Sequence, residues 1–442
     1  MGISATQSKL QDEHQLDSWH TDPILRLSRT LFYLALFASS VLIARVGAFT
    51  IGDVLLVASL LLLLLVSALN QEIVWTPSPF PLWGTVLAAC VFLFGAMLSV
   101  GNAILPEDSF SIVIRILLVA FIVPWQARRL LPTLSHIAVA AVWLLAGAAA
   151  AAAGSLLQYV AGPSIIPGGS VTDAGRFSGL TGHVSDLGGV ASMGVVLGVG
   201  VLLYAQTRRG KLLALASIFA AAVGLILSGS VSGLICVGAG LLVYVFRRAL
   251  KVRYLLLIVV IGLVVLAITA TIQSAVNGLS PIERILQTVG ISAGGRYSTT
   301  ESRAETYEAA AQYVIGSPIV GHGFDSLSAI ADGIFPPHNI VLGALFEGGV
   351  LTVLGLLAVA SRPFRGHWLR AQRSTAATTM LATAISAIVF AMTAPSLYNR
   401  YFWLPLALLG ACAAVSRTTH SKGETLVPSA QTRKSSLGAR GA

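Results

Sequence analysis

Charged residues and cysteines are both scarce in this chain. Asp, Glu, Lys and Arg together make up 10% of the 442 residues, which is few for a soluble protein. The three cysteines, Cys90, Cys236 and Cys412, fall one each in separate predicted helices, and no two stand at the spacing of a metal site. The sequence therefore argues against a zinc site and against a disulfide framework.

Apolar residues are abundant instead. They make up 55% of the chain and recur in runs along almost its whole length, which indicates a polytopic membrane protein. Such runs must form helices, because a chain in hydrocarbon has to satisfy its backbone hydrogen bonds internally and the alternating pattern of a β-barrel is absent. We predict an all-α membrane protein with about twelve spans, at residues 30–46, 51–69, 80–100, 110–126, 135–160, 185–205, 211–229, 232–247, 254–273, 338–360, 376–394 and 398–415.

The basic side chains are distributed as the positive-inside rule requires. With the N-terminus in the cytoplasm, the cytoplasmic segments hold clusters of Lys and Arg at 128–129, 208–211, 247–253, 362–373 and 417–440. The net charge of +10 is then explained by this topology and by contact with anionic lipids of the inner leaflet. The sequence shows no soluble basic domain that would bind nucleic acid. The outer segments hold six arginines, namely Arg45, Arg176, Arg284, Arg296, Arg303 and Arg400.

Both ends of the chain are polar. The first two dozen residues lack the short apolar core and cleavage site of a secretory signal, so residues 1–29 are expected to form a cytoplasmic tail. Residues 416–442 are rich in Ser, Thr, Gly and basic side chains and are predicted to form a disordered cytoplasmic tail. The transmembrane domain is then residues 30–415, in the cytoplasmic (inner) membrane with both termini inside.

Two outer loops are longer than ordinary connections, and function is expected there. The first covers residues 161–185, and the second covers 274–336, between spans nine and ten. The second loop contains a helix whose start is marked by the capping pattern Ser298-x-x-Glu301 and whose end is marked by Gly316 and Pro318. On that helix Arg303, Tyr307 and Val314 share one face, which is predicted to lie along the membrane surface.

Three residues suit the chemistry of a lipid-borne substrate, although each also has a structural explanation. Arg176 and Arg303 can grip phosphate oxygens with the planar fork of a guanidinium group. Alternatively, Arg176 is an interfacial arginine and Arg303 a solvated helix charge. His338, where the long loop meets an apolar helix, can accept a proton near neutral pH. Alternatively, His338 is a structural histidine at the helix start that bonds to a neighbouring loop.

Several other polar residues also have structural explanations. His183 and His322 are expected to be structural, and Asp186 is expected to cap the sixth span. Glu347 and Arg115 lie inside apolar spans, where a charge is costly, so each requires a partner or a watery cleft. The small residues of Ser228-Gly-Ser230-Val-Ser232-Gly233 are expected to allow close helix packing.

Four motifs in order between residues 170 and 405 resemble the O-antigen ligase and polysaccharide polymerase family. The hairpin departs from the family pattern, because Val231 stands where many members have an arginine, and this puts the role of the hairpin in doubt. The motifs are Arg176-x-Ser-Gly-Leu, the Ser228 to Gly233 hairpin, Arg303-x-x-x-Tyr307 with Pro318-x-x-Gly321-x-Gly323, and His338-Asn339 with Gly349-Val350-Leu-Thr352.

The resemblance implies a metal-independent membrane glycosyltransferase that needs no cofactor. It would move a glycan from an undecaprenyl-diphosphate carrier to an acceptor sugar hydroxyl at the outer face of the membrane, with the large loop covering a central cavity. In that scheme His338 deprotonates or orients the acceptor hydroxyl. Arg176 and Arg303 bind the diphosphate and stabilise its leaving charge, with Arg296 in reserve. The supporting residues are Tyr307, Asn339 and Glu347.

The acceptor stays open at this point. A second carrier-linked chain would make the protein a polymerase, and lipid A core or a protein would make it a ligase; the Arg176 loop favours a surface or extracellular polysaccharide polymerase. The implied partners are the lipid-linked donor, the glycan acceptor, membrane lipids and polysaccharide export machinery. The alternatives are a lipid-linked glycan flippase or transporter, for which Arg115 and Glu347 would be pathway residues, and a non-catalytic component of an export complex.

Overall fold

The structure is a computed structural model. It describes residues 22–46, 49–69, 82–172, 175–253, 256, 260, 262–263, 299–325, 337–368, 374–394 and 397–424. The predicted ninth span and most of the predicted large loop lie outside these residues, and so does Arg296.

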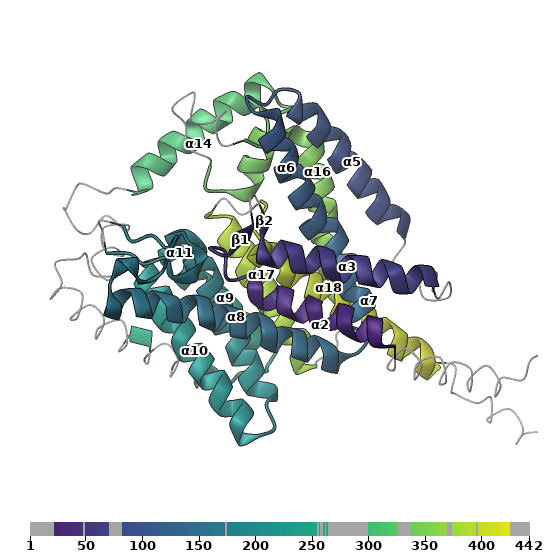
Figure 1. Ribbon diagram of the computed structural model, residues 1–442, viewed down its shortest axis with the longest axis vertical. Coiled ribbons are helices and arrows are strands. Elements are labelled where there is room, and N and C mark those ends of the chain that lie inside the picture. The colour runs from purple at the N-terminus through teal and green to yellow at the C-terminus, as the bar shows by residue number, and fades with distance from the viewer. Residues whose placement is uncertain are drawn as a thin grey trace, which may run out of the picture.

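The described chain is a bundle of helices, as Figure 1 shows. Besides the helices it holds a two-stranded antiparallel hairpin, β1 (Arg45–Val46) and β2 (Phe49–Thr50). The helices are α2 (Pro23–Ala38), α3 (Ile51–Leu69), α5 (Leu82–Val100), α6 (Pro106–Leu117), α7 (Val123–Leu130), α8 (Leu134–Ala161), α9 (Val184–Tyr204), α10 (Arg208–Ser228), α11 (Val231–Phe246), α14 (Thr299–Gly316), α16 (Ile340–Trp368), α17 (Thr375–Ala391) and α18 (Arg400–Glu424).

The apolar runs form helices of membrane-spanning length. Among the described residues, six helices are long and apolar enough to cross a membrane, and four shorter apolar helices accompany them. The protein is therefore a polytopic, predominantly α-helical membrane protein, as the composition predicts. The count of twelve spans stays a prediction, since the ninth lies outside the described residues.

Helix α18 lies at the centre of the bundle, where α7, α16 and α17 pack around it. Its side chains from Tyr401 to Ala413 are buried almost without interruption, and Trp403 is among the largest fully buried side chains. A helix that is apolar on all sides is expected at the core of a membrane bundle. In Figure 1, α8 to α11 lie on one side of this core, and α5, α6 and α16 lie on the other.

Local capping fixes where the helices begin. Helix α2 begins at Pro23, earlier than the predicted residue 30, because Asp22 accepts hydrogen bonds from the amides of Ile24 (2.8 Å) and Leu25 (3.2 Å). It ends at Ala38, and the β1–β2 hairpin follows where the predicted span continues to residue 46. At the other end, α18 runs to Glu424, past the predicted end at residue 415.

The fourth predicted span is longer than expected and contains a π-helical segment, Leu118–Ile122, between α6 and α7. Pro124 lies two residues after its end. Since a proline has no amide hydrogen and its ring crowds the carbonyl one turn earlier, the wider π turn accommodates it without ending the helix. Arg115 stands three residues before this segment, on the last turn of α6.

Candidate functional site

The Arg176 loop rests on the α10–α11 hairpin. The Nε of Arg176 donates to the carbonyl oxygen of Ser228 at 2.6 Å, and the amide of Phe177 donates to that of Leu227 at 3.0 Å. The hairpin turns at Gly229, whose φ is 59°, and Ser230 caps α11 by accepting from the amide of Gly233 at 3.1 Å. Two of the four sequence motifs thus meet, with an arginine of the loop held against the turn.

The hairpin also packs closely on α9. A Cβ atom at Gly188 would lie 2.4 Å from the Cβ of Ser230, so the two backbones approach more closely than any side chain at position 188 allows. The predicted packing role of these small residues is confirmed. It places the α10–α11 turn against α9 about one helical turn after the start of α9, because Gly188 is four residues after Val184.

His338 lies two residues before the start of α16 and is held by its neighbours. Asn339 caps the helix, because its Oδ1 accepts from the amides of Val341 (3.0 Å) and Leu342 (3.1 Å). Its Nδ2 donates to the carbonyl oxygen of Met392 at 3.5 Å, at the end of α17. The hydroxyl of Tyr307, on α14, donates to the carbonyl oxygen of His338 at 2.8 Å. Two of the predicted supporting residues therefore contact the His338 segment.

Helix α14 lies at the edge of the molecule in Figure 1 and packs on α16. Ala310 is buried against Phe346, with Val314 and Leu342 beside them. The helix ends at Gly316, as the Gly316 and Pro318 signal predicts. The start pattern at Ser298 and the Arg296 position lie outside the described residues. Arg303 belongs to α14 and stands four positions before Tyr307 in the sequence.

The segment from Pro318 to Gly323 closes a break in α16. Gly349 has φ 69° and ψ −179°, which no α-helix contains, so the carbonyl groups before it lose their usual amide donors. The amide of His322 donates instead to the carbonyl of Phe346 (2.9 Å), and the amide of Val350 donates to that of Pro318 (2.9 Å). Likewise, the amide of Gly323 donates to the Glu347 carbonyl at 3.0 Å. The loop therefore supplies the partners that the helix lacks.

The glycines of these two motifs are explained by that contact. A Cβ at Gly321 would lie 2.5 Å from the carbonyl oxygen of Glu347, and a Cβ at Gly349 would lie 2.1 Å from that of Ile319. Both glycines also have positive φ, which side chains disfavour. The spacing Pro318-x-x-Gly321-x-Gly323 and the distant Gly349 are one structural unit.

Glu347 lies beside this break. Its Oε2 is buried and has no hydrogen-bond partner among the described residues. Its carboxylate and that of Asp186 both act on Tyr398, in the connection between α17 and α18. Burial first, and then these two carboxylates, raise the pKa of Tyr398 to about 12. Glu347 and the α17–α18 connection therefore share one electrostatic environment.

A cavity of about 280 Å³ opens at this end of the bundle, and we call it the hairpin cavity because it adjoins β1 and β2. His338 and Arg176 are not among the described residues that line it, so the structure does not bring these two predicted residues into this cavity with each other. The lining residues are Leu42, Arg45, Thr50, Arg115, His183, Asp186, Tyr398, Asn399 and Arg400.

Charged groups hold the walls of the hairpin cavity in place. The guanidinium of Arg400 forms a buried ion pair with Asp53 at the start of α3, and its Nε donates to Oδ1 at 2.5 Å. Asp186 accepts from the hydroxyl of Tyr401 at 2.9 Å. The prediction that Asp186 caps its helix is wrong. His183 occupies the cap, its Nδ1 accepting from the amide of Ser185 at 3.3 Å, so the aspartate carboxylate is left to reach α18.

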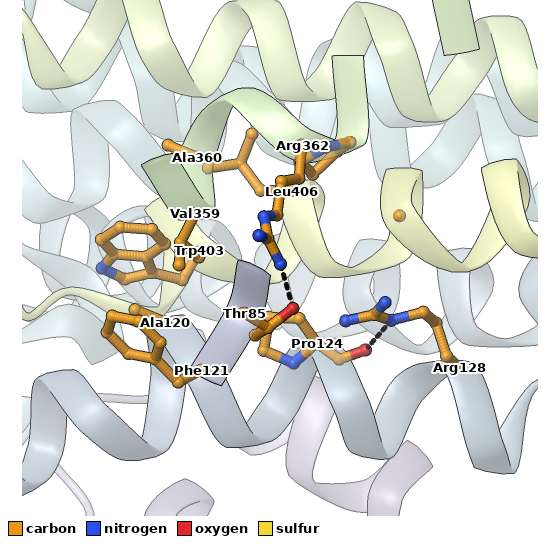
Figure 2. Close-up of a pocket in the computed structure, with 12 residues that line it drawn as sticks. Thr85, Ala120, Phe121, Pro124, Arg128, Val359, Ala360, Arg362, Trp403 and Leu406 are labelled. Atoms are coloured by element: carbon orange, nitrogen blue, oxygen red, sulfur yellow. Dashed lines mark hydrogen bonds between the residues drawn. The ribbon is translucent and has the colours of Figure 1, made fainter. Parts of the chain in front are cut away.

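A second, smaller cavity lies at the opposite end, where the basic clusters gather. Figure 2 shows Arg128 and Arg362 beside it, with the Arg362 guanidinium bonded to the hydroxyl of Thr85. Its volume of about 30 Å³ is that of roughly one water molecule in the liquid. Its walls are mainly apolar, with Phe121 and Trp403 among them. A sugar does not fit there, so the hairpin cavity is the stronger candidate for a polar group of a substrate.

Residues 216–357 match the family model described as O-antigen ligase. This match supports the assignment of the segment to the O-antigen ligase family. No curated protein matches the sequence. The matched segment runs from within α10 to residue 357 of α16 and contains the α10–α11 hairpin, Arg303, Tyr307, His338 and Gly349. The resemblance to that family, which those motifs indicate, is confirmed over this segment.

Several residues of the hairpin cavity are not predicted from the sequence. The sequence identifies Arg45 and Arg400 only as arginines of the outer segments, and it does not single out Asp53. The available signal was the charge itself, since Asp53 stands in the first turn of an apolar helix and Arg400 opens another. Their pairing across the chain, between α3 and α18, has no local signature.

Proposed function

We propose that the protein transfers a glycan from an undecaprenyl-diphosphate carrier to a sugar hydroxyl of an acceptor, at the outer face of a bacterial cytoplasmic membrane. The acceptor oxygen attacks the anomeric carbon of the donor glycan. The bond between that carbon and the phosphate oxygen breaks, and undecaprenyl diphosphate leaves with the bonding electrons. No metal ion is assigned a part in this reaction.

His338 is the proposed proton acceptor for the attacking hydroxyl, because an imidazole can take up that proton near neutral pH. Arg176 and Arg303 are the proposed ligands of the diphosphate, with Arg296 as a further candidate. Fixed guanidinium groups stabilise the negative charge that grows on the leaving group, and they do so without reorganising. Glu347 is a proposed positioning residue beside the break in α16.

The observation that carries this proposal is the hydrogen bond between the Tyr307 hydroxyl and the His338 carbonyl. It joins the helix that holds Arg303 to the residue proposed as the base. Asn339 fixes the same segment from the other side through its helix cap. Together with the family match over residues 216–357, the bond favours one site built from α14 and the start of α16.

We favour polymerisation of a surface or extracellular polysaccharide over ligation to lipid A core, on the likeness of the Arg176 loop to the polymerase branch. The acceptor is then a second lipid-linked glycan, and export machinery would receive the product. Both reactions use the same donor and the same bond change. They differ in whether the product can serve again as substrate.

The test is glycan transfer by the purified protein in lipid nanodiscs, with a lipid-diphosphate glycan, candidate acceptors and a metal chelator. A ladder of products indicates polymerisation, and one capped product indicates ligation. His338→Ala is expected to abolish transfer while the protein stays folded. His136→Gln is the matched control, because His136 lies at the start of α8 and bonds Arg29 and Thr133. Normal transfer by His338→Ala would refute the assignment, and lipid translocation without transfer would favour a flippase.

A further inference from the structure

The hairpin cavity gathers three arginines from three separate parts of the chain. Arg45 comes from β1, Arg115 from α6 and Arg400 from the start of α18. All of the lining residues lie outside residues 216–357, the segment that matches the ligase family. The cavity is therefore built by the rest of the chain, and the family match assigns it no role.

The positive charge around the cavity exceeds the negative charge that is built into its walls. Asp53 neutralises Arg400 in a buried ion pair. Asp186 is the second carboxylate, and its Oδ1 accepts from the hydroxyl of Tyr401 at 2.9 Å. Among the described residues that line the cavity, three guanidinium groups thus face one lining carboxylate, with that of Asp53 behind the wall. Gathering like charges at a partly buried site costs free energy unless a counter-charge joins them, and a ligand anion supplies that counter-charge.

Arg115 is positioned for such a ligand. It is half-buried on an apolar helix, with its guanidinium 5.9 Å from the centre of the Phe49 ring on β2. The π-helical segment Leu118–Ile122 begins three residues later, and such segments are frequent at functional sites. Arg45 is exposed at the rim, and its Nε donates to the carbonyl of Leu42 at 3.1 Å. One arginine therefore lies within the wall and one at the entrance.

The size of the cavity limits what it can hold. At about 280 Å³ it falls just below the range of roughly 300–1,000 Å³ typical of pockets for drug-sized ligands. A single phosphate-bearing or carboxylate-bearing group fits this space, and an extended glycan does not. The residue types agree, since the guanidinium fork bonds two oxygens of a phosphate or carboxylate at once.

The connection between α17 and α18 contacts both the cavity and the segment proposed for catalysis. The connection from α17 to α18 supplies Tyr398, Asn399 and Arg400 to its wall. At its other end, this connection follows Met392, whose carbonyl accepts from Asn339 beside His338. A group bound between Arg45 and Arg115 would thus belong to a substrate whose remainder extends toward His338.

We propose that the hairpin cavity is an anion-binding subsite that holds a phosphate or carboxylate group of the lipid-linked glycan on Arg45 and Arg115. This inference rests on the proposed function for the identity of its ligand. The anion has two possible sources, the diphosphate of the carrier and an acidic sugar of the glycan. The chemistry of recognition is the same for both.

The experiment measures binding of small probes to the full-length protein in nanodiscs of zwitterionic lipid. Farnesyl diphosphate represents the carrier head group and glucuronate represents an acidic sugar, with farnesol and glucose as uncharged counterparts. We expect one anionic probe to bind, and Arg115→Gln and Arg45→Gln to weaken it about tenfold or more. Arg115→Lys, which keeps the charge and loses the fork, should give an intermediate affinity. Arg128→Gln, at the opposite end, is the matched control and should bind as the wild type does.

Each outcome decides the proposal. Binding of farnesyl diphosphate alone identifies the carrier head group as the ligand, and binding of glucuronate identifies an acidic sugar. Equal affinity in the wild type and both Gln variants overturns the inference, as does binding of neither anion. If Arg115→Gln does not fold, Arg45→Gln at the exposed rim carries the test. Loss of transfer in His338→Ala with normal probe binding concerns only the reaction, so the two proposals fail separately.

Discussion

Asp53 and Arg400 form a buried ion pair that joins the start of α3 to the start of α18, with side chains 1% and 5% exposed. The pair links two segments that lie far apart in the sequence, and it forms part of the wall behind the hairpin cavity. Asp53 also accepts a hydrogen bond from the amide of Thr50 at 3.0 Å, which ties the β1–β2 hairpin to the same point. One carboxylate thus holds three elements together.

Asp53→Asn is expected to destabilise the protein by about 3–5 kcal/mol, because it leaves the Arg400 charge buried without its counter-charge. The side-chain amide of Asn keeps an oxygen that can accept from Thr50, so the loss of stability measures the ion pair alone. Thermal unfolding in detergent measures the effect. The double replacement Asp53→Leu with Arg400→Met should recover much of the loss, since an apolar pair can replace a buried ion pair. An unchanged melting temperature in the single variant would contradict this account.

Gly349→Ala is expected to break the contact between the Pro318 loop and α16. Its φ of 69° costs a side chain about 1–2 kcal/mol, and the new Cβ would also overlap the Ile319 carbonyl oxygen. Both stability and transfer should fall. Gly238→Ala is the control, because a Cβ there meets nothing within 4 Å and alanine favours the helix. Equal behaviour of the two variants would show that the break in α16 does not matter.

Tyr307→Phe removes one hydroxyl and keeps the ring. Because that hydroxyl bonds the His338 carbonyl at 2.8 Å, we expect the turnover number to drop by about 10- to 100-fold while stability changes by only about 1 kcal/mol. Steady-state transfer kinetics and thermal unfolding separate the two effects. Tyr204→Phe removes a comparable bond to the Ala138 carbonyl at 3.3 Å and should leave turnover unchanged. Normal turnover in Tyr307→Phe would remove Tyr307 from the site.

Arg176→Lys keeps the positive charge and loses both the planar fork and the bond to the Ser228 carbonyl. We expect the KM for the donor to rise about tenfold, with a smaller change in the KM for the acceptor. Transfer assays at varied donor concentration measure this. Arg208→Lys, an exposed position at the start of α10, serves as the control. An equal rise for donor and acceptor would point to a loop that shapes the site without binding the diphosphate.

Much of the fold follows from local sequence. The runs of apolar residues predict helices with boundaries close to those observed for α3, α8 and α9, since the hydrophobic length and the caps are both local properties. The end of α14 at Gly316 is local as well. The β1–β2 hairpin was not predicted, because its residues continue an apolar run and the turn depends on contacts with Asp53 and Leu180.

The candidate site, too, is predicted from the sequence only where it depends on local motifs. His338, Asn339 and Tyr307 are found from motifs, and the structure joins them through hydrogen bonds. The hairpin cavity is not found in this way, because Arg45 and Arg400 are hundreds of residues apart and only packing brings them together. Asp186 shows the difference most clearly. Its place at a helix start suggests a cap, but its carboxylate contacts Tyr401 on another helix.

The interruption at Gly349 gives α16 two parts with different attachments. The stretch from Ile340 to Gly348 is bonded to the Pro318–Gly323 loop, and Tyr307 on α14 holds the His338 residue that precedes it. The stretch after Gly349 packs within the bundle against α5 and α18. Ser99 on α5 bonds both the Glu347 carbonyl and the Gly323 amide, so the first stretch and the glycine loop are also anchored to the bundle. The His338 imidazole therefore projects from a segment that is braced from α5, α14 and α17 at once.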